Sequence, residues 1–233
     1  MFYSYFLKIY IYLGERFMCS FRKILSLSFL FLYLSLSFVS SAFSFGEYTD
    51  HQGSHISFRF LPEASSGEEE KKLFVASFDD NYRGLAPSQI KPHFTTREEV
   101  TEWLTGVFVS EWSDFKKAQH PMRVIDILKD GRLVGFAIVE RWGKEATTLH
   151  IRQMAVALDE QKHGYGSTLI EVLKTLPEMG PADRIIADTR TLNVKAQAFY
   201  KKLNFSMTPP HDPELAGNGN YIGLEWRSSP KLQ

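Results

Sequence analysis

The segment RLVGFAIVER, residues 132–141, is apolar on both faces of the strand that it forms, because its central side chains do not alternate between apolar and polar. A run of this kind belongs in the middle of a sheet. The preceding segment RVIDILK, residues 123–129, is joined to it by Asp130-Gly131, a dipeptide that favours the tight turn of a β-hairpin. The sequence therefore predicts a sheet with this hairpin in its interior.

Hydrophobic periodicity predicts further strands and helices around this hairpin. We expect strands at residues 55–61, 147–157, 184–189, 205–208 and 221–227, and helices at about 65–78, 95–115, 166–176 and 193–203. The first two helices open on capping-box patterns: Ser65 and Ser66 before Glu68 and Glu69, and Thr95 and Thr96 before Glu98 and Glu99. This order of elements predicts a mixed α/β (α+β) fold around one sheet, in a single domain over residues 55–228.

Charge and cysteine content exclude several classes of function. The chain has 27 Lys and Arg against 27 Asp and Glu, so general affinity for nucleic acid has no electrostatic basis. The single cysteine, Cys19, lies close to the N-terminus, which excludes a disulfide, a thiolate metal site and a cysteine nucleophile in the folded part. No other pattern indicates a metal site, because His51 and His55 have helical spacing but fall in a loop and a strand.

Residues 1–42 have the order of a secretory signal peptide. Arg22 and Lys23 precede the apolar run at residues 24–39, and Ser40-Ser41-Ala42 follows it, so we expect cleavage after Ala42 and a connecting segment at residues 43–54. The uncharged run continues to Gly46, and an uncleaved membrane anchor over residues 18–46 is the competing interpretation. The protein is thus predicted to be exported or membrane-anchored. If Met1 is not the true start, for which Met18 is the alternative, a cytoplasmic protein remains possible.

A glycine-containing loop joins the strand at 147–157 to the helix that follows it. The loop, residues 161–166, reads QKHGYG, and its two glycines let backbone N–H groups approach a ligand closely. The positive end of the following helix attracts phosphate, so the loop is a candidate pyrophosphate cradle. It lacks the third glycine of a Rossmann motif and the Gly-Lys-Ser/Thr ending of a Walker motif. By itself, the same pattern also fits a tight strand-to-helix turn.

The wider pattern resembles the GNAT superfamily of acyl-CoA-dependent N-acetyltransferases. The first matching motif is an apolar strand ending in Met154-Ala155-Val156, followed by Gln-x-x-Gly-x-Gly at residues 161–166. The second is an Asn-x-x-Ala-x-x-Phe-Tyr pattern completed by a later Phe, here Asn193, Ala196, Phe199, Tyr200 and Phe205. The resemblance covers roughly residues 55–227, although residues 55–120 match by element order alone.

One position departs from the family pattern. Asn204 stands where the second motif usually has glycine. The departure is mild, because asparagine also tolerates the left-handed backbone conformation that is often needed there.

The resemblance implies a GNAT-like mixed sheet, mostly antiparallel and flanked by helices, with acetyl-CoA as acyl-donor substrate and no metal. The pantetheine arm is expected along the backbone of Met154, Ala155 and Val156, and the pyrophosphate over residues 161–167. The residues expected to bind acetyl-CoA are Met154, Ala155, Val156, Gln161, Lys162, His163, Gly164, Tyr165, Gly166, Ser167, Asn193 and Tyr200.

Two residues are candidates for the base that takes a proton from the acceptor amine. His150 resembles in position the glutamate base of the histone-type branch, and imidazole titrates in a suitable range. The alternative is a strand histidine that only packs. Glu140, near the end of the preceding strand, is the second candidate, and its alternative is an exposed charge at a strand end.

Tyr200 is the candidate acid. The resemblance implies that it protonates the departing CoA thiolate, and the order of phenol and thiol pKa values allows this transfer. The alternative for Tyr200 is a packing role on its helix.

The predicted function is an N-acetyltransferase that moves acetyl from acetyl-CoA to an amine by direct attack in a ternary complex. Two alternatives stay open: a non-catalytic acyl-CoA-binding module, and an N-acyltransferase that uses a longer acyl-CoA. The acceptor is a small-molecule or protein amine. Beyond residue 42 the chain has 23 Lys and Arg against 26 Asp and Glu, which favours a cationic acceptor such as a polyamine, an aminoglycoside or a lysine side chain. The sequence does not indicate an oligomeric state.

Overall fold

The computed structural model describes residues 44–61, 65–117, 122–143, 147–176, 179–217 and 219–228. The predicted signal peptide or membrane anchor at residues 1–42 lies outside the described residues. Residues 43–233 form one unit by chain contacts. Within the described ranges, no helix has the length and apolar character needed to cross a membrane.

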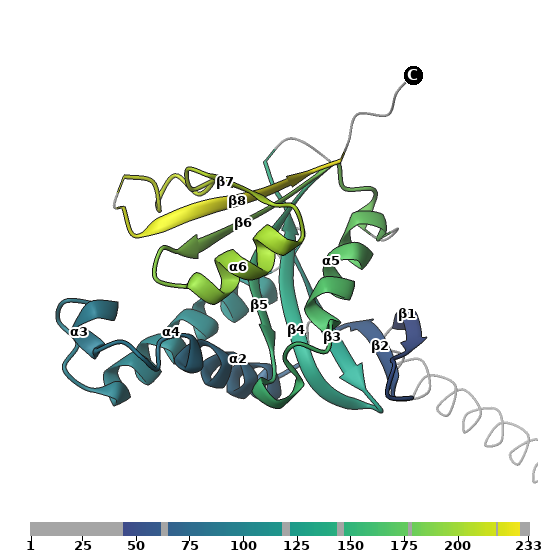
Figure 1. Ribbon diagram of the computed structural model, residues 1–233, viewed down its shortest axis with the longest axis horizontal. Coiled ribbons are helices and arrows are strands. Elements are labelled where there is room, and N and C mark those ends of the chain that lie inside the picture. The colour runs from purple at the N-terminus through teal and green to yellow at the C-terminus, as the bar shows by residue number, and fades with distance from the viewer. Residues whose placement is uncertain are drawn as a thin grey trace, which may run out of the picture. The chain divides into compact units, whose positions relative to one another are not determined.

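The described strands form one eight-stranded sheet in the order β1-β2-β3-β4-β5-β6-β8-β7 (Figure 1). Only β5 and β6 pair in parallel, and every other neighbouring pair is antiparallel. The predicted mixed, mostly antiparallel sheet is therefore confirmed. The strands are β1 (Ser44–Thr49), β2 (His55–Phe60), β3 (Met122–Lys129), β4 (Arg132–Arg141), β5 (Thr148–Val156), β6 (Arg184–Arg190), β7 (Ser206–Thr208) and β8 (Tyr221–Arg227).

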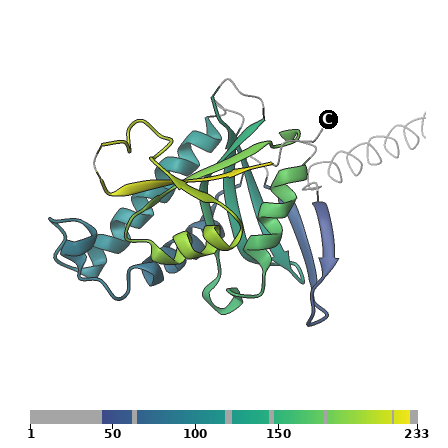
Figure 2. The ribbon, with the colours of Figure 1, turned by 45° about the horizontal axis from the view of Figure 1, so that its top comes forward.

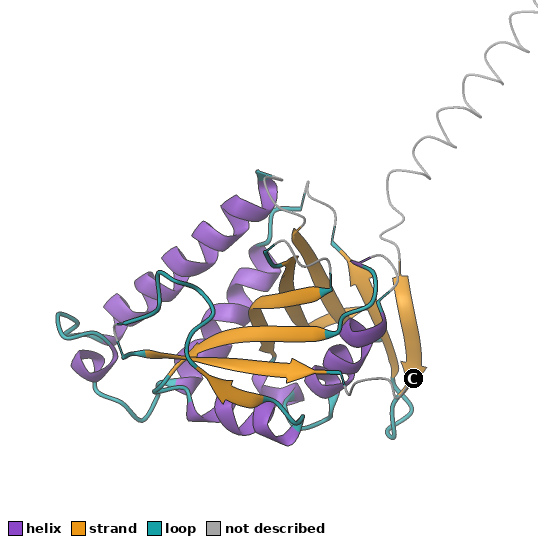
Figure 3. Cartoon of the chain, turned by 90° about the horizontal axis from the view of Figure 1, so that it is seen from above, coloured by secondary structure: helices purple, strands orange, loops and turns teal. Residues whose placement is uncertain are grey.

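Helices cover both faces of this sheet. In Figure 2, α5 and α6 (green) lie on the opposite side of the sheet from α4 (teal), and Figure 3 shows helices on both sides of the strands. The described helices are α2 (Glu68–Asn81), α3 (Pro87–Ile90), α4 (Arg97–Lys116), α5 (Tyr165–Thr175) and α6 (Val194–Lys202), with a 3-10 turn at Leu158–Glu160.

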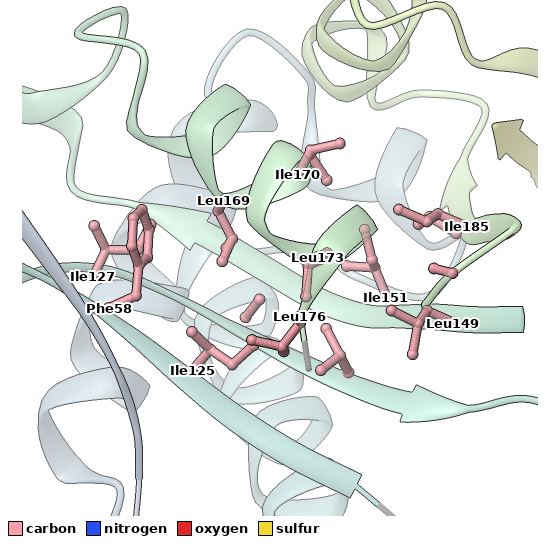
Figure 4. Close-up of a cluster of buried hydrophobic side chains, with 14 of the residues drawn as sticks. Phe58, Ile125, Ile127, Leu149, Ile151, Leu169, Ile170, Leu173, Leu176 and Ile185 are labelled. Atoms are coloured by element: carbon pink, nitrogen blue, oxygen red, sulfur yellow. The ribbon is translucent and has the colours of Figure 1, made fainter. Parts of the chain in front are cut away.

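The interior strand β4 is apolar on both faces because each face contributes to a separate core. Ala137 and Val139 belong to the cluster beneath α5, whereas Phe136 and Ile138 belong to the cluster beneath α2 and α4. Figure 4 shows the first cluster, in which Leu169, Leu173 and Leu176 lie between α5 and the strands. The predicted interior position of this hairpin is confirmed.

The segment at residues 43–54 is not the unstructured connection that was expected. It contains β1, an edge strand that pairs antiparallel with β2. The turn between them is closed by Asp50, whose Oδ1 accepts hydrogen bonds from the backbone N–H groups of Gln52 (2.8 Å) and Ser54 (2.9 Å). An edge strand buries little, so its sequence carries no strong apolar alternation.

The two predicted capping boxes have different outcomes. Thr96 caps α4 as expected, because its hydroxyl accepts from the N–H of Glu99 while the Glu99 carboxylate accepts from the N–H of Thr96 (2.9 Å). The start of α2 is different: its N-cap is Gly67, in the left-handed conformation (φ 72°), with no side-chain cap. The helix thus begins at Glu68, three residues after the predicted start at about residue 65. The short α3 lies between the two predicted helices at 65–78 and 95–115, where no helix was predicted.

Candidate active site

The two parallel strands at the centre of the sheet separate halfway along their length (Figure 1). Residues Thr148 to Ile151 of β5 pair with Arg184 to Ala187 of β6, and the pairing ends there. On its other side, β5 stays paired with β4 as far as Val156. A cleft of ≈ 1030 Å³ opens where the strands diverge, and it is lined by β5, β6, the glycine loop, α6, α2 and α4.

The last residues of β5 turn main-chain groups towards this cleft. The N–H of Ala157 donates to the carbonyl of Val134 on the β4 side (2.8 Å). Because successive residues of a strand point to alternate sides, the N–H and C=O groups of Met154 and Val156 face away from β4 and into the opening. The carbonyl of Val156 accepts from the side-chain amide of Gln161 (3.2 Å), which ties the glycine loop to the strand.

The glycine loop continues this main-chain surface into the N-terminus of α5. Gly164 is the N-cap and adopts φ 92°, a conformation that favours glycine. Gly166 lies against α6, where an added Cβ would come within 3.3 Å of the Phe199 ring. The first N–H groups of α5 are left without helical partners and favour an anion at this end. The side chain of Lys162 adds a positive charge to the lining of the cleft.

Of the residues expected to bind acetyl-CoA, only His163 falls outside the cleft lining. Its Nδ1 lies 3.8 Å from Glu160 Oε2, and its ring stacks on Tyr165. The Tyr165 hydroxyl is used structurally, because it donates to Asp50 Oδ2 (2.9 Å). The residues brought together in the lining are Met154, Ala155, Val156, Gln161, Lys162, Gly164, Tyr165, Gly166, Ser167, Asn193 and Tyr200.

Helix α6 supplies the wall of the cleft opposite the β5 main chain. Asn193 caps this helix by accepting from the N–H of Ala196 (3.2 Å), and its side chain is buried. After the helix, Asn204 has φ 63°, the left-handed conformation expected of the residue that replaces glycine there. The helix is therefore fixed at both ends by its two asparagines.

Tyr200 lies on the inner side of α6 and lines the cleft. Its side chain is buried, and burial alone raises the pKa of the phenol above its ordinary value. A phenol with a raised pKa stays protonated near neutral pH. It can therefore donate a hydrogen bond or a proton into the cleft.

His150 and Glu140 lie together on the face of the sheet that α4 covers, and neither is in the cleft lining. His150 Nδ1 is 3.1 Å from Glu140 Oε1, and Arg152 Nη1 is 3.2 Å from the same oxygen. Burial raises the pKa of Glu140, but the hydrogen bond from His150 and the charge of Arg152 outweigh it and lower the value. Glu140 is thus a buried, ionised partner of His150, and the expectation that it could be an exposed strand-end charge is wrong.

Sequence reasoning missed Asp188 of β6, a carboxylate that lines the cleft. Its Oδ1 accepts from the N–H of His211 (2.8 Å), its Oδ2 accepts from the N–H of Asp212 (3.0 Å), and the His211 ring lies 3.2 Å from Oδ1. Burial raises the pKa of Asp188, yet these hydrogen bonds outweigh burial and lower it. A charged residue inside an apolar strand is the signal that could have identified it.

The remaining wall of the cleft comes from α2 and α4 and is mostly apolar, with Ser77, Asp80 and Asn81 as its polar residues. At its far end, the guanidinium of Arg190 lies 5.7 Å from the Tyr82 ring centroid and 5.4 Å from that of Trp103. The apolar and aromatic residues of this wall are Phe74, Phe78, Tyr82, Trp103, Leu104 and Val107. Within the part of the chain that the structure describes, no group of three or more His, Cys, Asp or Glu side chains is placed to hold a metal ion.

Comparison with known proteins agrees with this geometry. Residues 91–205 match the family profile described as the acetyltransferase (GNAT) family. No curated protein shows a significant sequence match to the chain.

Two solved structures share the fold at low sequence identity. One is the PaiA N-acetyltransferase from Thermoplasma acidophilum in complex with coenzyme A, with a TM-score of 0.55, 15% identity, and coverage of 74% of this chain and 99% of that one. The other is the GNAT domain of PAT from S. lividans, with a TM-score of 0.51, 13% identity, and coverage of 81% and 98%.

Proposed function

Residues 91–205 belong to the acetyltransferase (GNAT) family, and we propose that this chain transfers an acetyl group from acetyl-CoA to an amine by direct attack in a ternary complex. One observation supports the proposal above all others. The main chain of Met154 and Val156 faces the cleft, and the N-terminus of α5 borders the same cleft. An extended ligand that carries amide groups and ends in a pyrophosphate matches both parts of this surface.

The residues present fit acetyl-CoA. The main-chain groups of Met154 and the N–H of Val156 are available to the amides of the pantetheine arm, and the α5 N-terminus with Lys162 is available to the pyrophosphate. Gly166 allows α6 to approach closely enough to form the other wall. Acetyl-CoA supplies the activated thioester.

The side chains near the point where β5 and β6 separate have the chemistry for acyl transfer to an amine. Overall, a bond forms between the amine nitrogen and the acetyl carbon, the carbon–sulfur bond breaks, the amine loses a proton and the thiolate gains one. Tyr200 stays protonated because its pKa is raised, so it is the proposed donor to sulfur. Nothing in the proposal requires a covalent acyl-enzyme.

We assign proton removal to His150, with Glu140 as its positioning residue. Glu140 accepts from Nδ1 of His150, which leaves Nε2 as the nitrogen that can take a proton. Nε2 points towards Asp188 Oδ2, 3.9 Å away, and Asp188 lines the cleft. A proton from an amine beside Asp188 has a short path to this ring.

Turnover with acetyl-CoA and a panel of amines, read by release of free thiol, tests the proposal. Amine-dependent thiol release is the expected result. If the protein binds acetyl-CoA but no amine releases thiol, the chain is a non-catalytic acyl-CoA-binding module. If only longer acyl-CoA donors react, the chain is an N-acyltransferase of a different donor range.

We also propose that the segment at residues 1–42 directs export. Its charged residues, apolar run and Ser40-Ser41-Ala42 site occur in the order of a cleavable signal. N-terminal sequencing of the protein from its native source should find Phe43 as the first residue. An intact segment on membrane-bound protein would instead support an anchor, and unprocessed protein in the cytoplasm would contradict both.

A further inference from the structure

At the far end of the cleft two cations lie against the ring of Trp103, and one of them, Arg190, lines the cleft. Arg190, the last residue of β6, lies with its guanidinium 5.4 Å from the centroid of Trp103. Lys91 reaches the same ring from the loop after α3, with Nζ 4.7 Å from the centroid. Burial lowers the pKa of Lys91, and the nearby charge of Arg190 lowers it further. The two positive charges therefore repel each other.

Neither cation is neutralised by the protein. Among the described residues, no carboxylate forms an ion pair with Lys91 or Arg190. The guanidinium donates through Nη2 to the carbonyl of Ile90, while Nη1 is buried and has no hydrogen-bond partner among those residues. A buried N–H donor without a partner is unfavourable, so this corner is suited to an acceptor atom from a ligand. Arg190 itself lines the cleft.

The same strand presents an anion a short distance away. Asp188 precedes Arg190 by two residues, so both side chains lie on one face of β6, with Cα atoms roughly 6.6 Å apart. Asp188 is held ionised by His211 and by the N–H of Asp212, and it also lines the cleft. One wall of the cleft thus presents a carboxylate near the point where β5 and β6 separate, and a cationic corner further out.

We infer that the amine acceptor is a small molecule that also carries an anionic group, a carboxylate or a phosphate. Its ammonium lies beside Asp188 before it loses a proton, and its anion lies at Arg190 with Lys91 behind it. The apolar wall made by α2 and α4 receives the part of the molecule between or beside these groups. An amino acid with an apolar side chain is the simplest compound of this class.

This inference rests on the proposed acetyl transfer and replaces the cationic acceptor that net charge favours. Net charge describes the field far from the surface, whereas the acceptor contacts individual groups at short range. A polyamine would place only positive charge against Arg190 and Lys91. An acceptor with both charges satisfies Asp188 and Arg190 together.

Matched acceptor pairs test the inference in full-length protein. Phenylalanine is compared with phenylalaninamide, and glucosamine 6-phosphate with glucosamine, with spermidine as a purely cationic amine. Thiol release at saturating acetyl-CoA gives kcat/KM, and calorimetry gives the affinity of each amine independently of turnover. We expect the anionic member of at least one pair to be preferred by about tenfold or more, and the pair that shows this distinguishes a carboxylate from a phosphate.

Variants of Arg190 and Lys91 test whether these two cations cause the preference for anionic amines. Arg190→Gln should abolish the preference by weakening only the anionic member, Arg190→Lys should restore part of it, and Lys91→Met should reduce it. Acetyl-CoA affinity should stay unchanged in all three. Arg83→Gln is the matched control, because Arg83 is an exposed cation of the same region, with 72% of its side chain accessible, and it does not line the cleft.

Three results would overturn the inference. The first is equal or better use and binding of the uncharged or cationic amines by the wild-type protein. The second is an equal effect of Arg190→Gln on both members of every pair, which would mean that Arg190 only attaches β6 to the α3 region. The third is loss of acetyl-CoA affinity in Arg190→Gln, which would assign the corner to a CoA phosphate. Failure of the proposed function differs from all of these: no amine, anionic or not, would release thiol from acetyl-CoA.

Discussion

His150 Nε2 lies 3.9 Å from Asp188 Oδ2, and this approach connects two neighbouring parallel strands on the α4 side of the sheet. On its other side, the imidazole is bonded to Glu140 of β4. The ring is therefore held between carboxylates from two strands. Of these three residues only Asp188 lines the cleft, so in the proposed reaction the proton of an amine would reach the buried histidine past that carboxylate.

This arrangement predicts an effect of His150 on the pH dependence of the reaction. His150→Ala should flatten the alkaline-rising limb of the pH–rate profile and lower kcat by about 100-fold or more, since general-base catalysis typically contributes that much. His55→Ala, which changes an exposed histidine on β2, is the control and should leave the profile unchanged. Identical profiles for His150→Ala and wild type would show that His150 is not the base.

Tyr200→Phe should lower kcat while acetyl-CoA affinity stays within about twofold. The variant keeps the ring that packs between α6 and the sheet but removes the hydroxyl, whose raised pKa keeps it protonated. The expected loss in kcat is on the order of 10²-fold. Single-turnover kinetics and calorimetry separate the two effects, and Tyr48→Phe on β1 is the control. Equal loss of affinity and rate would instead indicate a packing role.

Gly166→Glu should abolish acetyl-CoA binding and leave the fold intact. The new side chain would place a negative charge at the N-terminus of α5, and its Cβ would press against the Phe199 ring at 3.3 Å. Gly106→Glu is the matched control, because it adds the same charge on α4 where no atom lies within 4 Å of an added Cβ. Calorimetry measures affinity and circular dichroism checks the fold. If Gly166→Glu is folded and binds acetyl-CoA with unchanged affinity, the glycine loop is not the pyrophosphate-binding site.

Stability should fall as pH rises from about 4 to about 7, because of Asp126. Burial and the charge of Glu70 raise the pKa of this carboxyl to about 7, although Arg59 bonds to it at 3.0 Å. The folded state therefore holds a proton that the unfolded state, with a pKa of about 3.9, releases. The group's contribution declines by up to about 1.4 kcal/mol per pH unit across this window. Urea denaturation of Asp126→Asn should show a flatter pH dependence than wild type.

Gly67→Ala should destabilise the protein more than Gly53→Ala does. Both glycines have positive φ, 72° and 83°, so both substitutions carry the cost of a left-handed alanine, about 1 kcal/mol. Only at Gly67 would the added Cβ also meet the Trp112 ring, at 2.3 Å, which adds about 1–3 kcal/mol of overpacking. Thermal and urea denaturation give the two free energies of unfolding. Equal losses would mean that the Trp112 ring moves away without cost.

The sequence by itself determined the features that depend on neighbours along the chain. The β3–β4 hairpin follows from its turn dipeptide and its apolar strands, the start of α4 from Thr96 and Glu99, and the left-handed Asn204 from its position after α6. The glycine loop was identifiable for the same reason, since strand, loop and helix N-terminus are consecutive.

Only the tertiary structure decided which side chains share the cleft and what they face. Asp188, His211 and Arg190 come into place through the parallel register of β5 and β6, the return of the chain after β7, and the packing of α2 and α4. Their residue types do not reveal these roles: Asp188 stands out in the sequence as a charge inside an apolar strand, but such a charge can face solvent, a partner or a substrate. The burial of each side chain and its distance from its neighbours determine which role it has, and both depend on packing between segments far apart in the sequence.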